Sequence, residues 1–216
     1  MKQINFKELG ELIMNCVCSY PYGSRVYGTH SENSDFDFIL IFEDDFAKNL
    51  DDQYLYYKER YLSPGQFLEE NYSIYSRSKF QSMLDEHHIS ALECFFLPEP
   101  DLSFVKFNFK LNLDKLRKSI SEKVSHSWVK AKKKFEIESD RNIYVGKKSL
   151  FHSFRIIDFG MQIGKNGKID DYQSCVGLWN EIKNNPSQNW KDYEILYKES
   201  HNKWMSEFRK FALKGN

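Results

Sequence analysis

Two aspartates separated by one residue are the feature of this sequence that most directly suggests chemistry. Asp35 and Asp37 open the segment Asp35-Phe36-Asp37-Phe38-Ile39-Leu40-Ile41-Phe42, whose aromatic and β-branched residues predict a strand. Because side chains alternate along a strand, both carboxylates project from the same face. Adjacent carboxylates repel each other, and a divalent cation such as Mg²⁺ or Mn²⁺ relieves that repulsion while it also binds phosphate groups. The pair therefore predicts a metal site.

A glycine-serine turn precedes the aspartates. Residues 16–20 read as a short strand, and Pro21-Tyr22-Gly23-Ser24 follows as a turn. A backbone without a Cβ, together with a hydroxyl and free N–H groups, can close around a phosphate. Arg25 adds a positively charged donor next to it. Each feature is common when it stands alone, as a solvated strand edge or an ordinary turn, so the information lies in their order.

The combined order is G-S-R-x-x-G…S-D-x-D, which runs from Gly23 to Asp37. It resembles the DNA polymerase β-like nucleotidyltransferase superfamily, whose signature is G-S followed by D-x-D. The fuller form is similar to a subgroup of bacterial and phage-type predicted nucleotidyltransferases, some of them associated with RNA repair. Residues 76–80 with Ala91-Leu92-Glu93, and residues 147–157, extend the similarity to that subgroup.

The resemblance implies transfer of a nucleoside monophosphate (NMP) from an NTP to a hydroxyl acceptor, with pyrophosphate as the leaving group. It implies that Asp35 and Asp37 are catalytic and bind Mg²⁺ or Mn²⁺, and that Gly23 and Ser24 bind the triphosphate, with Arg25 as a further nucleotide-binding candidate. The acceptor stays open between an RNA or tRNA end, a protein hydroxyl and a small molecule.

The sequence departs from the superfamily at a third carboxylate, which is expected on the next strand. That strand is best placed at Tyr72–Tyr75, which contains no acid, and Asn71 falls where the acid is expected. Glu69, Glu70 and Glu93 are the other candidates. An asparagine offers a neutral oxygen to Mg²⁺ but cannot act as a base. The alternative function is therefore a catalytically impaired nucleotide- or RNA-binding protein, such as an antitoxin-like regulator. A carboxylate close to the aspartate pair would favour the enzyme, and Asn71 alone would favour the binding protein.

A second group of candidate residues lies on a predicted helix at 145–163. Lys148, His152 and Arg155 are spaced i, i+4 and i+7, so they share one face of that helix. Such a face suits a triphosphate or a nucleic-acid phosphate, which makes these three residues candidates for nucleotide binding. A solvated helix face is the alternative interpretation.

Charge is distributed unevenly along the chain. The totals cancel, with 31 Lys and Arg against 31 Asp and Glu. From Glu32 to Glu70, however, eleven acids stand against three bases, and from Lys106 to Lys134 ten bases stand against two acids. The acidic segment can gather cations. A basic run is usually a solvated helix face; the alternative is a surface for a nucleic-acid acceptor.

The predicted elements change in kind along the chain. An amphipathic helix at about 5–15 and the strands described above are followed by an acidic, Tyr-rich stretch at 43–70 that we expect to be irregular or partly helical. Beyond residue 105 the sequence predicts helices at about 111–135, 145–163, 171–184 and 189–212. We therefore expect an α+β fold: a catalytic domain with a small mixed sheet over 1–105, then an all-helical substrate- or nucleotide-binding domain over 106–216.

Composition excludes some classes of protein. No uncharged run approaches the roughly 18 apolar residues that a membrane span needs, and the N-terminus lacks the apolar core of a signal peptide. The four cysteines show no zinc-ligand spacing, which favours reduced thiols. We expect a cytoplasmic protein without a membrane partner; the sequence does not predict its oligomeric state.

Overall fold

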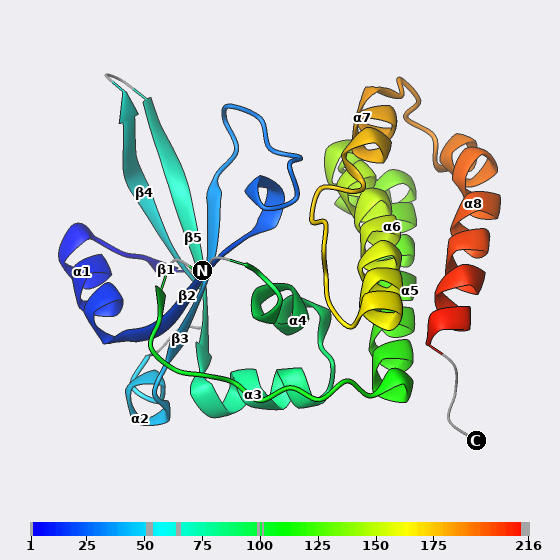
Figure 1. Cartoon of the computed structure of the whole chain (residues 1–216). Helices are drawn as coiled ribbons and strands as arrows, with labels where there is room; N and C mark the ends of the chain where they lie inside the picture. Colours follow the sequence, from blue (N-terminus) through cyan, green and yellow to red (C-terminus); the bar gives the residue numbers. More distant parts are fainter. Residues whose placement is uncertain (1, 51–53, 64–65, 99, 101, 213–216) are drawn as a thin grey trace. The chain divides into compact units, whose positions relative to one another are not determined.

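The computed structural model describes residues 2–50, 54–63, 66–98, 100 and 102–212. The chain forms two compact units, one made of Met1–Asp85 and Ser90–Lys110, the other of Glu86–Ile89 and Leu111–Asn216. The first unit contains a mixed sheet, and long helices make up most of the second (Figure 1). The expected α+β class, a small mixed sheet followed by a helical region, is confirmed.

In the described part of the chain, six strands form the sheet of the first unit. They are β1 (Lys2–Gln3), β2 (Cys16–Tyr22), β3 (Phe36–Phe42), β4 (Tyr54–Ser63), β5 (Gln66–Ser76) and β6 (Leu102–Ser103). Their order across the sheet is β1-β4-β5-β3-β2-β6. β3 pairs in parallel with β5 and antiparallel with β2. The strand that carries Asp37 is therefore central. Its pairing with β2 and β5 determines which residues lie beside Asp37.

One face of the sheet is covered by α1 (Phe6–Asn15). Leu9 and Leu12 of this helix share a buried cluster with Leu40 and Phe42, which point to the same side of β3 because they are two residues apart. Asn5 begins α1 through a capping box, in which its side chain accepts from the N–H groups of the first turn. The predicted helix at 5–15 is confirmed.

The opposite face is covered by α3 (Arg77–Asp85) and α4 (Ile89–Phe95). Figure 1 shows α1 on one side of the sheet and α4 on the other. Ile39 and Ile41 of β3 are almost fully buried, and Tyr20, which pairs with Ile39, stacks on Phe80 of α3 with 5.9 Å between ring centroids. By alternation Asp37 lies on this same face, at the end of the strand where the core stops.

The acidic, Tyr-rich stretch differs from its expected irregular form. It contains the short helix α2 (Asp44–Ala47), the whole of β4 and the first half of β5, so the prediction of an irregular or partly helical segment was wrong over 54–63 and 66–70; its residues 51–53 and 64–65 lie outside the described residues. Tyr and Leu favour extended backbone, and the antiparallel pairing of β4 with β5 satisfies the backbone hydrogen bonds there. The acidic composition does not indicate these strands, because each is stabilised by its pairing with the other.

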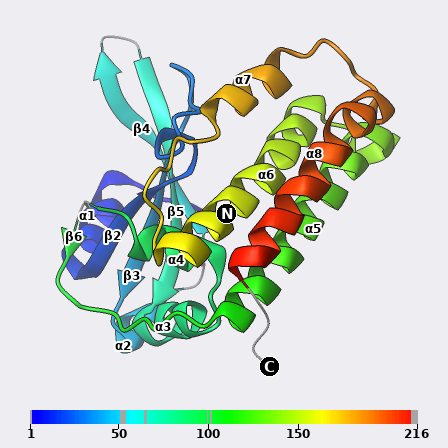
Figure 2. The ribbon, with the colours of Figure 1, turned by 45° about the vertical axis from the view of Figure 1, so that its right-hand side comes forward.

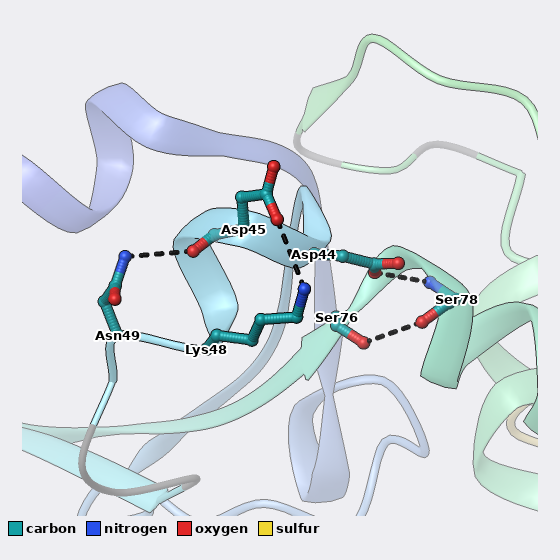
Figure 3. Close-up of polar contacts among 6 residues, drawn as sticks. All are labelled: Asp44, Asp45, Lys48, Asn49, Ser76 and Ser78. Carbon is teal, nitrogen blue, oxygen red and sulfur yellow. Dashed lines mark hydrogen bonds and ion pairs between the residues drawn. The ribbon is translucent and has the colours of Figure 1, made fainter.

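Polar contacts tie α2 to the beginning of α3 (Figure 3). The carboxylate of Asp44 accepts from the backbone N–H of Ser78 at 2.9 Å, and the hydroxyl oxygens of Ser76 and Ser78 lie 3.3 Å apart. Ser76 Oγ also accepts from the N–H of Lys79 at 3.2 Å. These bonds satisfy donors that a helix start leaves open, and an acid there also suits the helix dipole. The bonds from Ser78 lower the pKa of Asp44. On α2 itself, Lys48 and Asp45 form an exposed ion pair at 3.2 Å (Figure 3).

The second unit is built from α5 (Leu113–Glu136), α6 (Ile143–Asn166), α7 (Val176–Asn184) and α8 (Trp190–Phe211). Figures 1 and 2 both show α5, α6 and α8 running alongside one another. Asparagines cap three of the helices: Asn112, Asn142 and Asn189 each accept from an N–H of the first turn. The four predicted helices are confirmed, although α7 begins later than expected, at Val176.

Aromatic side chains and glycines allow close packing of these helices. Gly146 of α6 lies against the ring of Phe135, and Gly160 lies against Ile120 and Phe208, so that a Cβ at either glycine would be crowded. The result is a tightly packed helical core whose largest fully buried side chains include Trp179, Trp190, Tyr193, Phe151 and Phe154.

All four cysteines are buried as free thiols. Burial raises the pKa of Cys16 to about 11 and that of Cys175 to about 12, so neither is a reactive thiolate near neutral pH. Among the helices that the structure describes, none combines the length and apolar character required to cross a membrane.

Candidate active site

The two aspartates converge at one end of β3. Asp37 is the second residue of the strand, and Asp35 directly precedes it. Asn71 lies opposite Asp37 in the parallel pairing of β3 with β5. Its side-chain nitrogen Nδ2 lies 2.6 Å from Asp35 Oδ2 and 3.3 Å from Asp37 Oδ1. Because one atom contacts both carboxylates, the structure brings the predicted pair together on one face.

Asn71 lies at the strand position where the resemblance to the superfamily leads us to expect a third carboxylate. Glu70, its neighbour in β5, points to the other face of the sheet and accepts a hydrogen bond from the Tyr72 hydroxyl. Glu93 accepts from Tyr27 at 2.6 Å. Glu69 shares the strand face of Asn71 by alternation. Within the described residues, no His, Cys, Asp or Glu joins Asp35 and Asp37 to make a group of three that could hold a metal.

The glycine-serine turn lies directly against Asp37. β2 ends at Tyr22, and a single 3₁₀ turn covers Gly23–Arg25. Gly23 has a φ of +76°, and a Cβ at this position would lie 2.9 Å from Asp37 Cγ. A residue with a side chain can therefore fit here neither by conformation nor by space. Ser24, 9% exposed, has no hydrogen bond to its hydroxyl from any described residue, which leaves that hydroxyl available to a ligand.

Tyr27 anchors this turn to the helical cover of the sheet. Its backbone N–H donates to the Gly23 carbonyl at 3.2 Å, and its hydroxyl donates to Glu93 of α4 at 2.6 Å. Both side chains are only 2% exposed. Sequence reasoning missed Tyr27; the available signal was an aromatic residue between two glycines, Gly23 and Gly28, both of which have positive φ.

Arg25 contacts the backbone that carries Asp35. Its guanidinium donates to the carbonyl of Ser34 at 2.6 Å and to that of Asp35 at 3.2 Å, and it lies over the Phe36 ring with Cζ 3.7 Å from the centroid. Two hydrogen bonds and a cation–π contact hold the guanidinium plane in place. Arg25 thus holds the loop before β3 in place, and its contact with a nucleotide phosphate stays a prediction.

The remaining candidates lie on α6 in the helical unit. Arg155, 4% exposed, donates through Nε to His152 Nδ1 at 3.3 Å, and its Cζ lies 4.9 Å from the centre of the Phe159 ring. Lys148 lies over the Tyr144 ring at 5.5 Å. Burial is the main cause that holds the pKa of His152 well below its usual range, and nearby cations, Arg155 and Lys148 first among them, add to it. His152 is therefore neutral at pH 7 and accepts from Arg155.

The aromatic residues near the basic segment of α5 are part of the core. Phe135 is 4% exposed, and Trp128 packs with Trp190 at 5.3 Å and with His201 at 4.3 Å between ring centroids. These rings stabilise the helical unit. The exposed basic residues of α5 are Lys118, Lys123, Lys130, Lys132 and Lys133, of which Lys132 forms an ion pair with Glu136 at 3.8 Å.

The donor atoms at the aspartate pair suit a hard divalent cation. Two carboxylates and one amide offer oxygen ligands, which Mg²⁺ and Mn²⁺ prefer, and the amide oxygen Oδ1 of Asn71 is a buried atom without a hydrogen-bond partner in the described structure. The pair therefore fits such an ion, with a neutral third ligand in place of an acid.

Fold and site together define a domain that brings paired carboxylates to a glycine-serine turn. The chain belongs to the nucleotidyltransferase domain family, of the DNA polymerase β-like superfamily: the family's sequence model matches residues 18–126, half of the chain, which includes Gly23, Asp35, Asp37 and Asn71. In a search of curated proteins, no sequence matches this chain.

Proposed function

We propose that the protein transfers an NMP from an NTP to a hydroxyl acceptor and that Asp35 and Asp37 hold the divalent cation, Mg²⁺ or Mn²⁺, that this reaction uses. The observation that carries the proposal is the convergence of both carboxylates on one nitrogen of Asn71, next to a turn where only glycine fits. In a nucleotidyltransferase domain this geometry supports a site for a metal and a triphosphate.

The residues of the site have two kinds of role in this proposal, binding the triphosphate and positioning the groups that bind it. Gly23 lets a phosphate approach the backbone closely, and the Ser24 hydroxyl can donate to a phosphate oxygen. Arg25 and Tyr27 hold the turn and the Asp35 loop in place. A divalent cation held by Asp35 and Asp37 would neutralise charge on the triphosphate and on the two carboxylates.

In the reaction, the acceptor oxygen forms a bond to the α-phosphorus, the bond from that phosphorus to the bridging oxygen breaks, and pyrophosphate leaves. The acceptor loses its proton in this step. Asp35 and Asp37 can accept it as carboxylates, whereas the amide of Asn71 cannot.

An RNA or tRNA end is the acceptor that we propose. The support is the exposed lysines of α5, which offer positive charge to a phosphate backbone. Several other bases of that segment are engaged within the helical unit: Lys115 pairs with Glu86 at 3.1 Å, and Arg117 donates to the carbonyl of Ala212 at 2.9 Å. The exposed lysines are therefore the ones to test, by their effect on the salt dependence of RNA binding.

A second function, nucleotide or RNA binding without catalysis, is favoured by Asn71. Its amide fills the position where the third acid is expected, and within the described residues no other acid completes the group. Such a protein would bind an NTP with a cation and act as a regulator of the antitoxin type.

Incubation with each labelled NTP and Mg²⁺ or Mn²⁺ tests the two functions, with total RNA, tRNA and the protein itself as acceptors. We expect label in one acceptor, and loss of that label in the double variant Asp35→Ala with Asp37→Ala. Asp45→Ala, which removes an exposed acid of α2, is the matched control and keeps the incorporation. NTP binding without incorporation would support the regulator, and incorporation that survives the double variant would exclude the proposed mechanism.

A further inference from the structure

The Asn71 amide occupies the space between two carboxylates, and its orientation is fixed by charge. An amide nitrogen carries two hydrogens, and each can be donated to one aspartate. The contacts of Nδ2 are 2.6 Å to Asp35 and 3.3 Å to Asp37. The reverse orientation would place the amide oxygen at 2.6 Å from a carboxylate oxygen, where two acceptors repel. In the metal-free chain the nitrogen must therefore face the pair.

This orientation leaves the other end of the amide unsatisfied. Asn71 Oδ1 is buried and has no hydrogen-bond partner among the described residues. A buried acceptor without a partner costs about 1–3 kcal/mol, which the two charge-assisted bonds of the nitrogen offset. Among the described residues, the two bonds to the carboxylates are the hydrogen bonds that orient this amide, so a group that replaces them removes the preference for this orientation.

A divalent cation is such a replacement, because it cannot share the space between the carboxylates with an NH₂ group. We propose that Asn71 is an exchangeable ligand: it bridges Asp35 and Asp37 through Nδ2 in the metal-free protein, and it turns Oδ1 toward the ion when a divalent cation binds. This inference rests on the proposed metal-dependent function. With two acids and one neutral oxygen, the charge of the site matches one divalent ion.

Side-chain amide NMR tests the exchange in the wild-type protein, and a substitution serves only to assign the Asn71 signals. The nitrogen-bound protons of Asn71 are assigned by their absence from the spectrum of Asn71→Asp. During a Mg²⁺ titration we expect both protons to move upfield together, because they lose their carboxylate acceptors, in step with the side-chain carbonyl carbons of Asp35 and Asp37. Movement of the aspartate carbons while the Asn71 protons stay in place would overturn the exchange and leave the metal site intact.

Mn²⁺ affinity, measured by electron paramagnetic resonance, supplies a second test. Asn71→Asp adds a charged ligand and is expected to tighten Mn²⁺ binding by roughly tenfold or more, whereas Asn71→Leu removes the ligand and weakens it to a similar degree. Asn33→Asp adds the same charge at an exposed position close to Asp35 in sequence, and we expect a change of less than about threefold, the effect of charge alone.

The results separate this inference from the proposed function. Equal Mn²⁺ affinity in wild type, Asn71→Asp and Asn71→Leu would overturn the role of Asn71, provided that Asp35→Ala with Asp37→Ala abolishes binding. Wild-type protein that binds no Mn²⁺, or binds it equally well after loss of both aspartates, would overturn the metal site itself and the inference with it.

Discussion

Gly23 lies in contact with the carboxylate of Asp37, although the two residues belong to different elements. A Cβ on Gly23 would lie 2.9 Å from Asp37 Cγ, and the glycine has a φ of +76°. The pairing of Tyr22 with Asp37 in β2 and β3 produces this contact, because it places the residue after Tyr22 beside the aspartate. The turn and the metal-binding candidate are therefore one structural unit.

Gly23→Ala is expected to disrupt that unit. The substitution strains a left-handed backbone by roughly 1–2 kcal/mol and pushes the methyl group into the carboxylate. We expect a lower free energy of unfolding in urea and loss of NTP binding by calorimetry. Gly10→Ala is the matched control: it lies in α1 with open space around it and is expected to stabilise the chain by about 0.5–1 kcal/mol. Unchanged NTP affinity in Gly23→Ala would contradict the contact.

Tyr27→Phe is expected to loosen the turn from α4. The variant leaves the buried carboxylate of Glu93 without the Tyr27 hydroxyl, which costs about 1–3 kcal/mol of stability. Because Tyr27 acts through the turn, KM for the NTP should rise more than kcat falls. Glu93→Gln, which keeps an acceptor oxygen, should weaken the protein less, and the double variant should cost less than the two single changes together. Tyr144→Phe, at an exposed tyrosine, is the control, and additive effects of the pair would refute the coupling.

Arg25→Lys distinguishes a positioning role from direct phosphate binding. Lysine keeps the positive charge but loses the planar donor that bonds to Ser34 and Asp35 and stacks on Phe36. We expect Arg25→Lys and Arg25→Ala to lower Mn²⁺ affinity to the same extent, because both release the Asp35 loop. If lysine restored wild-type Mn²⁺ and NTP affinity, charge rather than geometry would be the contribution of this residue.

His201 makes stability depend on pH in the helical unit. Burial against Trp128 and Phe154 lowers its pKa from 6.5 to about 4, and its Nε2 has no partner among described residues. Between these values the unfolded chain binds the proton and the folded chain does not, so stability falls as the pH drops from about 6.5 to about 4. The loss amounts to about 3 kcal/mol. His152 adds a contribution of the same sign.

Urea unfolding at a series of pH values measures this effect. His201→Phe keeps an aromatic ring but carries no titrating group, so its stability should fall less between pH 6.5 and 4 than that of the wild type. Parallel curves for the two proteins would show that His201 does not titrate in this range.

Local pattern was sufficient for the central strand and the metal-binding candidates. The alternation of Asp35, Asp37, Ile39 and Ile41 defines a strand that is polar at its beginning and buried over its second half, and the structure has this arrangement. The long helices α5, α6 and α8 were also predicted from the sequence, and the structure adds the asparagine caps at which they begin.

Features that depend on pairing were not accessible from the sequence. β4 is stabilised by its pairing with β5, so its acidic, Tyr-rich composition alone does not predict a strand. The bond between Tyr27 and Glu93 joins residues 66 positions apart. Arg25 and Arg155 both satisfy the pattern for phosphate ligands, which stays a prediction, but the pattern did not reveal that Arg25 bonds to backbone carbonyls and Arg155 to His152. A charge pattern identifies the cationic side chains but not the groups of the folded chain to which they donate hydrogen bonds.

The parallel register that sets Asn71 beside Asp37 also has an evolutionary consequence. Codons for asparagine and aspartate differ at a single base, so an acid can appear or vanish at this place while the sheet, the turn and the core stay as they are. A lineage with this scaffold stands one mutational step from a site with three acids, and natural selection can move between the two states without passing through an unfolded ancestor.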